Sequence, residues 1–206
     1  MDTLADRINQ YCDVAGRPLS DGDITDLPVS YRTVLLHANG FSTRDGVFRL
    51  FGTERLESLP NIYDWNESTW RKGYGDIFDG ILVVAEDIFG DQYGYERESS
   101  SLVKVFCEGG ERQVIDSSDL VSFLKTSILV DEPNAYDVQM VRQAFKAEMR
   151  PRLDEHLAFE LPLIANGEYD ITNLHVESTP LHLGVLGQMS LKNRGLPDGT
   201  PIRHFT

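Results

Sequence analysis

The sequence predicts an α+β fold: a mixed, mostly antiparallel sheet with helices packed around it, and a helical extension at its C-terminal end. Short β-rich segments separated by turn residues crowd together between residues 81 and 115, and their connections are too short for helical crossovers. Segments with helical apolar spacing lie on both sides of this stretch. Hydrophobic residues make up 41% of the 206 residues and charged residues 25%, which is typical of a globular protein.

Two helices are expected ahead of the sheet. Apolar residues at positions i, i+4 and i+7 predict the first over about residues 3–12, and the Gly-Arg-Pro segment at 16–18 should end it. Pro28 should begin the second, because a first helical turn does not need the N–H group that proline lacks. Asn39 and Gly40 are expected to form the left-handed cap that ends this second helix.

The sheet is expected to contain an antiparallel meander. Its central strand is the continuous apolar run 81–85, which turn residues flank and which should be buried on both faces. The other predicted strands cover residues 46–51, 92–95, 102–107 and 112–115. Residues 60–74 are predicted as a helical or irregular segment packed on the sheet. Trp65 and Trp70 in this segment are interpreted as core aromatics or, if exposed, as interface anchors.

The C-terminal part is predicted to be mainly helical. Ser117 or Ser118 should cap a helix that follows the meander. Further along, we expect a helix over about residues 138–149, a strand near 174–176 and a last helix from residue 179. Residues 154–156, Asp-Glu-His, are expected on a polar helix or loop face.

The domain organisation follows from a break in the chain near residues 131–135, where Glu-Pro-Asn interrupts the helical pattern. We expect an α+β domain over residues 1–130 and an extension over residues 131–206 that packs on the same domain. The locally basic residues 192–206 are expected to form an extended tail.

The net charge of −14 and the pI of about 4.7 restrict the class of partner. A field of this sign repels phosphate, so nucleic acid is not an expected partner. The same field attracts a basic protein, although acidity also serves solubility alone. No apolar run approaches the roughly 20 residues that span a bilayer, and residues 1–6 show no secretory signal, so we expect a cytoplasmic protein without a membrane partner.

Residues that often carry metal or redox chemistry form no recognisable motif here. Cys12 and Cys107 lie far apart and are expected to be buried thiols rather than a disulfide. The histidines, among them His156, His175 and His182, are scattered and are expected to be surface or capping residues. No metal and no cofactor is expected, because neither a metal-ligand spacing nor a glycine-rich phosphate loop is present.

Three segments occur in an order that is similar to one known family. The first consists of residues 27–31 with Asn39-Gly40-Phe41, and the second holds the two tryptophans ahead of the apolar strand. The third and most specific is Ala85-Glu86-Asp87-Ile88-Phe89-Gly90-Asp91-Gln92-Tyr93. This strand–turn–strand resembles the central signature of the SUKH superfamily, whose members include fungal (Smi/Knr-like) cell-wall assembly regulators and bacterial immunity proteins. The resemblance covers roughly residues 27–129.

The resemblance implies a protein-binding role without catalysis. The leading hypothesis is an immunity protein that binds a cognate bacterial toxin, such as a nuclease, and occludes its active site. The alternative is a non-enzymatic regulatory or scaffold protein like the fungal members, although the long acidic tails expected of such regulators are absent. A small-molecule enzyme is a third class, which a deep pocket with convergent polar groups would support.

The candidate partner-binding residues are Glu86, Asp87 and Asp91 of the signature, together with Tyr95 and Glu96, which follow it. Between residues 76 and 98 there are seven acidic residues and one basic residue. Clustered carboxylates could dock against the Lys/Arg lining of a nuclease cleft and speed association. The motif has a structural explanation as well, because Gly90 suits a hairpin turn. Glu86 and Asp87 are neighbours on a strand and should point to opposite faces, which argues against a shared acid/base site.

Overall fold

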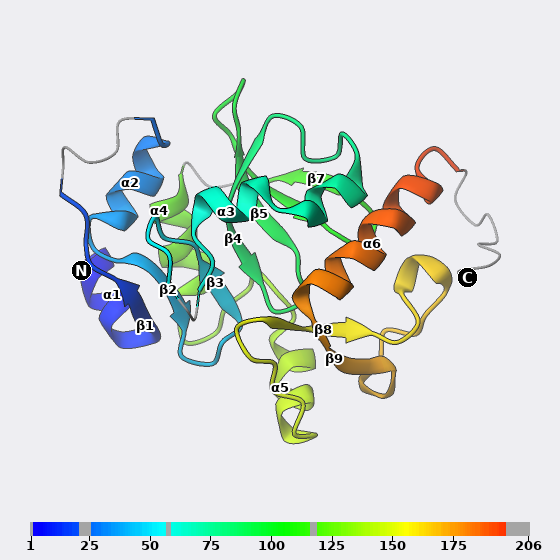
Figure 1. The fold of residues 1–206 in the computed structure, drawn as a ribbon. Helices are drawn as coiled ribbons and strands as arrows, with labels where there is room; N and C mark the ends of the chain where they lie inside the picture. The colour runs from blue at the N-terminus through cyan, green and yellow to red at the C-terminus, as the bar shows by residue number, and fades with distance from the viewer. Residues whose placement is uncertain (1, 21–25, 57–58, 116–118, 197–206) are drawn as a thin grey trace.

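A computed structural model shows an α+β fold and describes residues 2–20, 26–56, 59–115 and 119–196 (Figure 1). Seven strands form one sheet in chain order, and each strand pairs antiparallel with the next. The strands are β1 Cys12–Gly16, β2 Asn39–Thr43, β3 Phe48–Leu50, β4 Ile81–Asp87, β5 Gln92–Glu96, β6 Leu102–Phe106 and β7 Glu111–Val114. The predicted fold class and the meander from residue 81 onward are confirmed, and the pairing of these strands is antiparallel rather than mixed.

Helices cover both faces of this sheet. They are α1 Leu4–Tyr11, α2 Val29–Leu35, α3 Ile62–Glu67, α4 Leu120–Phe123, α5 Val138–Lys146 and α6 Thr179–Asn193, with the 3₁₀ helix η1 Thr69–Tyr74 and the π-helical turn η2 Leu124–Ile128. On one face Phe48 packs against Phe123 of α4, and on the other Phe51 packs against Trp65 of α3. Residues 83–85 of β4 are fully buried, as the apolar run predicted.

The N-terminal segment differs from the prediction after its first helix. Helix α1 begins at a capping box between Thr3 and Asp6, but β1 follows it directly and pairs with β2. The expected cap at Asn39 and Gly40 is wrong, because α2 ends before these residues and they begin β2. Gly40 does have a positive φ of 88°, but a Cβ there would lie 2.8 Å from the backbone nitrogen of Gly52. Its role is therefore a close approach of two backbones inside the fold.

The segment with both tryptophans packs on the sheet as α3 and η1. Trp65 and Trp70 are 7% and 6% exposed, which confirms the core interpretation. Their rings lie 5.5 Å apart, and Trp70 also meets Phe78 edge to face. The N-cap of α4 is Asp119, which accepts a hydrogen bond from the N–H of Ser122. The predicted caps, Ser117 and Ser118, lie outside the described residues.

The C-terminal part contains α5, a two-stranded antiparallel sheet and α6. The sheet is formed by β8 Glu155–Phe159 and β9 Leu174–Ser178, between which lie the 3₁₀ turns η3 Leu163–Ala165 and η4 Ile171–Asn173. The expectation of a helix or loop at residues 154–156 is wrong, since two of these three residues begin β8. Helix α6 packs against η1, and its Leu183 and Leu186 join the same core as the large sheet (Figure 1).

Two further expectations concern thiols and membranes. Cys12 and Cys107 are buried free thiols, as predicted. Burial raises the pKa of Cys12 to about 12, so this thiol is unreactive at neutral pH. Within the described ranges, no helix combines the length and the apolar character needed to cross a bilayer.

Candidate functional site

The signature motif forms the end of β4, a tight turn and the start of β5. Asp87 holds this turn, because its Oδ1 accepts hydrogen bonds from the N–H groups of Phe89 at 3.0 Å and Asp91 at 3.2 Å. Gly90 has a φ of 85°, a conformation that glycine adopts without strain. A Cβ at Gly90 would also lie 3.0 Å from Nδ1 of His156. The glycine therefore shapes the turn and makes room for a side chain from the C-terminal part.

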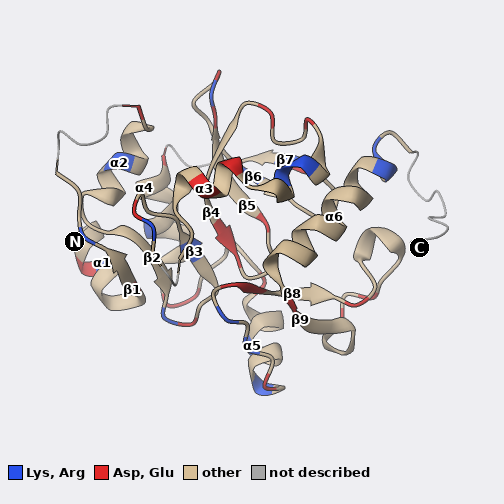
Figure 2. Cartoon of the chain, viewed as in Figure 1, with Lys and Arg blue, Asp and Glu red and all other residues tan. Residues whose placement is uncertain are grey.

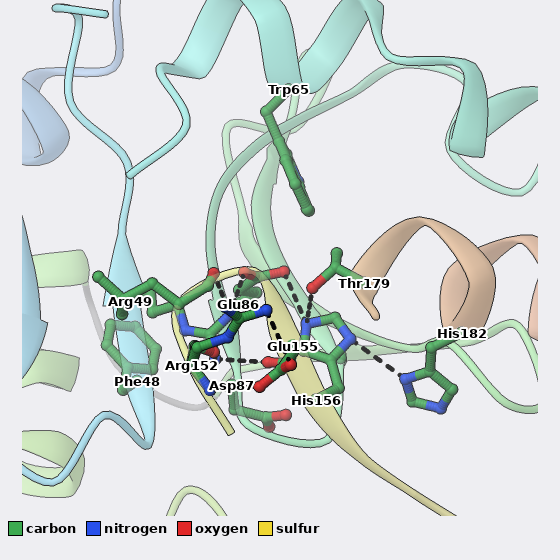
Figure 3. Close-up of polar contacts among 12 residues, drawn as sticks. Phe48, Arg49, Trp65, Glu86, Asp87, Arg152, Glu155, His156, Thr179 and His182 are labelled. Carbon is green, nitrogen blue, oxygen red and sulfur yellow. Dashed lines mark hydrogen bonds and ion pairs between the residues drawn. The ribbon is translucent and has the colours of Figure 1, made fainter. Parts of the chain in front are cut away.

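Glu86 lies on the opposite face of β4 and is 1% exposed. Its Oε1 is 3.1 Å from Nη1 of Arg49, and its Oε2 is 3.3 Å from Nε2 of His156 (Figure 3). Burial acts to raise the pKa of Glu86, but the neighbouring His156 and Arg49 outweigh burial and lower the pKa below its ordinary value. Glu86 is therefore an ionised internal partner that another protein cannot reach.

Arg49 joins the large sheet to the C-terminal part of the chain. This fully buried side chain donates to Glu86 and to three backbone carbonyls, those of Arg152 at 3.2 Å, Leu153 at 2.8 Å and Glu155 at 2.8 Å. A buried ion pair is tolerated when further hydrogen bonds satisfy its members. Both Nη groups of Arg49 meet that condition, whereas its Nε is buried without a hydrogen-bond partner among the described residues. The pair thus positions the start of β8 against β3 and β4.

His156 and His182 are buried side by side, so the expectation of surface or capping histidines is wrong for both. They are 0% and 8% exposed, and their Nδ1 atoms are 3.1 Å apart. Burial, and secondarily His156, lower the pKa of His182 well below its ordinary value, so His182 is neutral at pH 7. Among the described residues, no group of three or more His, Cys, Asp or Glu side chains is arranged to hold a metal ion.

Lys104 of β6 lies between two carboxylates on the other face of the sheet. Its Nζ is 3.0 Å from Oδ2 of Asp87 and 2.9 Å from Oδ2 of Asp91. Burial lowers the pKa of Lys104, but the attraction of Asp87, Tyr93 and Asp91 outweighs it and raises the pKa above its ordinary value. Burial and the adjacent Asp87 raise the pKa of Asp91 to about 7. Two carboxylates share one ammonium group here, and Asp91 holds a proton close to neutral pH.

This arrangement predicts a pH dependence that Asp91→Asn should remove. The folded state binds a proton at Asp91 up to a pH of about 7, whereas the unfolded chain releases it near 3.8. The contribution of Asp91 to the free energy of unfolding should therefore fall as the pH rises between these values. Urea unfolding at pH 4.5, 6.0 and 7.5 checks this, and the wild type should lose stability relative to the variant along the series. Asp137→Asn is the control, because backbone hydrogen bonds lower the pKa of Asp137, so this carboxyl is ionised in both the folded and the unfolded state across the series and the variant should keep the wild-type slope. Equal slopes for the wild type and Asp91→Asn would contradict the assignment.

A cleft of about 500 Å³ opens beside these charged residues, between the large sheet and the C-terminal part. Its walls are largely apolar and include Phe89, Phe106, Tyr136, Phe159, Leu163 and Tyr169. The ionisable groups among its described lining residues, tyrosines aside, are Asp91, Lys104, Glu108, Glu111, Asp137 and His182. Ligand-binding sites commonly combine this size, apolar walls and a few convergent polar groups.

Two of the carboxylates at the cleft are held in place by hydrogen bonds. Oε1 of Glu108 accepts from the first two N–H groups of η3, and burial raises the pKa of Glu108. Oδ2 of Asp137 accepts from the hydroxyl of Tyr169 at 2.7 Å. These carboxylates therefore have defined positions before any ligand binds, which reduces the entropy cost of binding.

Tyr95 and Glu96 lie at the far end of β5, on a second groove. This groove has a volume of about 1230 Å³ and runs between α2 and α3. Val29 and Tyr63 on its rim are 69% and 52% exposed. An apolar rim next to acidic groups such as Glu96 is a surface that another protein could cover.

The five candidate residues thus do not form one surface. Glu86 and Asp87 are internal, Asp91 lines the cleft, and Tyr95 and Glu96 line the groove. Sequence reasoning missed Lys104, Glu108 and His182. Lys104 carried a signal, since it interrupts an otherwise apolar strand, and a charge at such a position usually has a partner. Nothing local distinguished Glu108 or His182.

Comparisons with known proteins show the fold but not a function. No family model matches the chain, and no curated protein matches it. A solved structure, Atu4351 from Agrobacterium tumefaciens, is similar with a TM-score of 0.57 at 11% identity, over 88% of this chain and 86% of that chain. At this identity the likeness supports the architecture alone.

Proposed function

We propose that this chain is an immunity protein of the SUKH type, which binds a cognate bacterial toxin and occludes its active site. The observation that carries the proposal is the cleft, where described carboxylates outnumber the one ammonium group, on a chain with a net charge of −14. The strand–turn–strand signature supports the family, because its residues make the turn and the internal pairs described above. The contact residues differ from those expected from the sequence, since Glu86 and Asp87 are internal.

Binding rather than catalysis is the proposed activity. The carboxylates of the signature form ion pairs with Arg49 and Lys104. Their role is therefore to stabilise the fold and the shape of the cleft. Figure 2 shows Asp and Glu residues on several loops as well as on strands, and the chain has 33 acidic residues against 19 basic ones. Such a surface would steer a basic toxin face toward the protein, and steric cover of the toxin's active site would neutralise it.

Co-expression with the product of the adjacent reading frame tests the proposal. We expect growth to be restored when both proteins are made, and a stable 1:1 complex to be purified. The association rate should fall about tenfold or more between roughly 50 mM and 500 mM salt, because screening shortens the range of charge attraction. A folded protein that neither binds that product nor restores growth would contradict the proposal.

A second candidate, recognition of a small molecule, is favoured by one observation. The cleft is apolar, has a volume within the range of small-molecule sites and contains Asp91 with a pKa of about 7. A small ligand would raise the melting temperature of the isolated protein without any protein partner. A screen of metabolites by thermal shift, followed by the same screen on Asp91→Asn, distinguishes this candidate from toxin binding.

A further inference from the structure

We propose that the cleft between β6 and η3 is an anchor pocket for one basic side chain, arginine or lysine, of the protein partner. The inference rests on the proposed function and deepens it, since it names the kind of partner side chain that the cleft would receive. Three features of the cleft support it: the hydrogen-bonding character of its polar groups, the placement of the Lys104 ammonium group, and the aromatic walls.

The polar groups that the described residues present to the cleft are almost all acceptors. Oε2 of Glu108 and the carboxylate of Glu111 have no hydrogen-bond donor among the described side chains. The hydroxyl of Tyr169 is a donor, but it already donates its hydrogen bond to Asp137. A ligand rich in donors and positively charged would complement this set, whereas an anion would meet carboxylates.

His182 adds a polar atom without a partner to the cleft. Its Nδ1 lies 3.1 Å from Nδ1 of His156 (Figure 3). No described residue forms a hydrogen bond with Nε2 of His182. The side chain is more than nine-tenths buried and lines the cleft, so a ligand in the cleft can supply a partner for this nitrogen.

Lys104 shows that the cleft stabilises a cation. Its Nζ lies 4.9 Å from the ring centre of Phe106 and 5.2 Å from that of Tyr93, while Asp87 and Asp91 balance its charge. Because the ammonium group of Lys104 is already paired with these carboxylates, it is not available to bind an anionic ligand. The aromatic walls beyond it suit the alkyl stem and the flat guanidinium of an arginine.

Titration with single-residue probes, followed by ¹H–¹⁵N NMR, tests the inference without knowledge of the partner. The probes are N-acetyl-arginine amide, N-acetyl-lysine amide, the uncharged isostere N-acetyl-citrulline amide and the anionic N-acetyl-glutamate amide. One side chain should bind with a Kd on the order of millimolar. We expect shifts at residues 106–111, at residues 163–164 and at the His182 ring nitrogens with the two cationic probes, and none with the other two.

Charge variants then locate the contact. Glu108→Gln with Glu111→Gln should weaken binding of the arginine probe about tenfold, because glutamine keeps the acceptor that η3 uses but removes the charge. Glu98→Gln is the matched control on an exposed loop and should leave binding unchanged. Unchanged binding in the double variant, equal binding of citrulline, or no shifts at the cleft would each overturn the inference.

The same double variant separates this inference from the proposed function. If it also weakens the toxin complex, the cleft is the anchor pocket of that partner. If the probes bind but no toxin complex forms, the cleft is a cation site whose ligand is a free amine. That result would overturn the assignment of a protein partner. A toxin complex that forms without probe binding would overturn the cleft assignment alone.

Discussion

Glu86→Gln is expected to lower the free energy of unfolding by about 3–5 kcal/mol, the cost of leaving one member of a buried ion pair without its partner. The substitution keeps the shape of the side chain and an acceptor for His156, but it leaves the guanidinium of Arg49 uncompensated in the interior. Arg49 also holds the start of β8, so the loss should loosen the C-terminal part as well as the sheet. Urea unfolding followed by the fluorescence of the buried tryptophans measures the effect.

Glu132→Gln is the matched control for this prediction. Glu132 pairs with Arg142 at 3.1 Å, but the two side chains are 72% and 48% exposed. The same chemical change should therefore cost no more than about 1 kcal/mol. A double variant, Glu86→Gln with Arg49→Met, should recover part of the loss, because it removes the stranded charge. Equal effects at Glu86 and Glu132 would show that the Arg49 pair contributes no more than a surface pair.

Gly187→Ala is expected to destabilise the protein by about 1–3 kcal/mol, although alanine favours helices more than glycine does. A Cβ at Gly187 would lie 2.8 Å from the carbonyl carbon of Gly73 and 2.8 Å from Cδ2 of Tyr74. Helix α6 therefore crosses η1 at a contact that only a glycine permits, and an added methyl group must push the two elements apart. Calorimetric and urea unfolding of the variant provide the measurement.

Gly184→Ala, one turn earlier on α6, should have the opposite sign. A Cβ at Gly184 meets no described atom within 4 Å, so the substitution should stabilise the protein by about 0.5–1 kcal/mol through helix propensity. The two variants separate the cost of packing from the intrinsic cost of glycine in a helix. If both were stabilising, the close crossing of α6 and η1 would not exist in solution.

Local pattern was sufficient for much of the fold. The apolar run 81–85 predicted a strand buried on both faces, and the alternating segments after it predicted the meander. The prediction of secondary structure failed where the same residues are common in two kinds of element. Asn39-Gly40 reads equally well as a helix cap and as the start of a strand, and the deciding contact, the approach to Gly52, is not local.

The sequence by itself determined the α+β class and the positions of the central strands, because these follow from the periodicity of neighbouring residues. Only the tertiary structure decided the chemistry of the site. Glu86 and His156 are 70 positions apart, and whether a carboxylate faces solvent or a buried partner depends on which distant segment packs against it. The acidic signature therefore looked like a binding surface in the sequence. In the folded chain Arg49 and Lys104 neutralise it, and the cleft beside it becomes the candidate site.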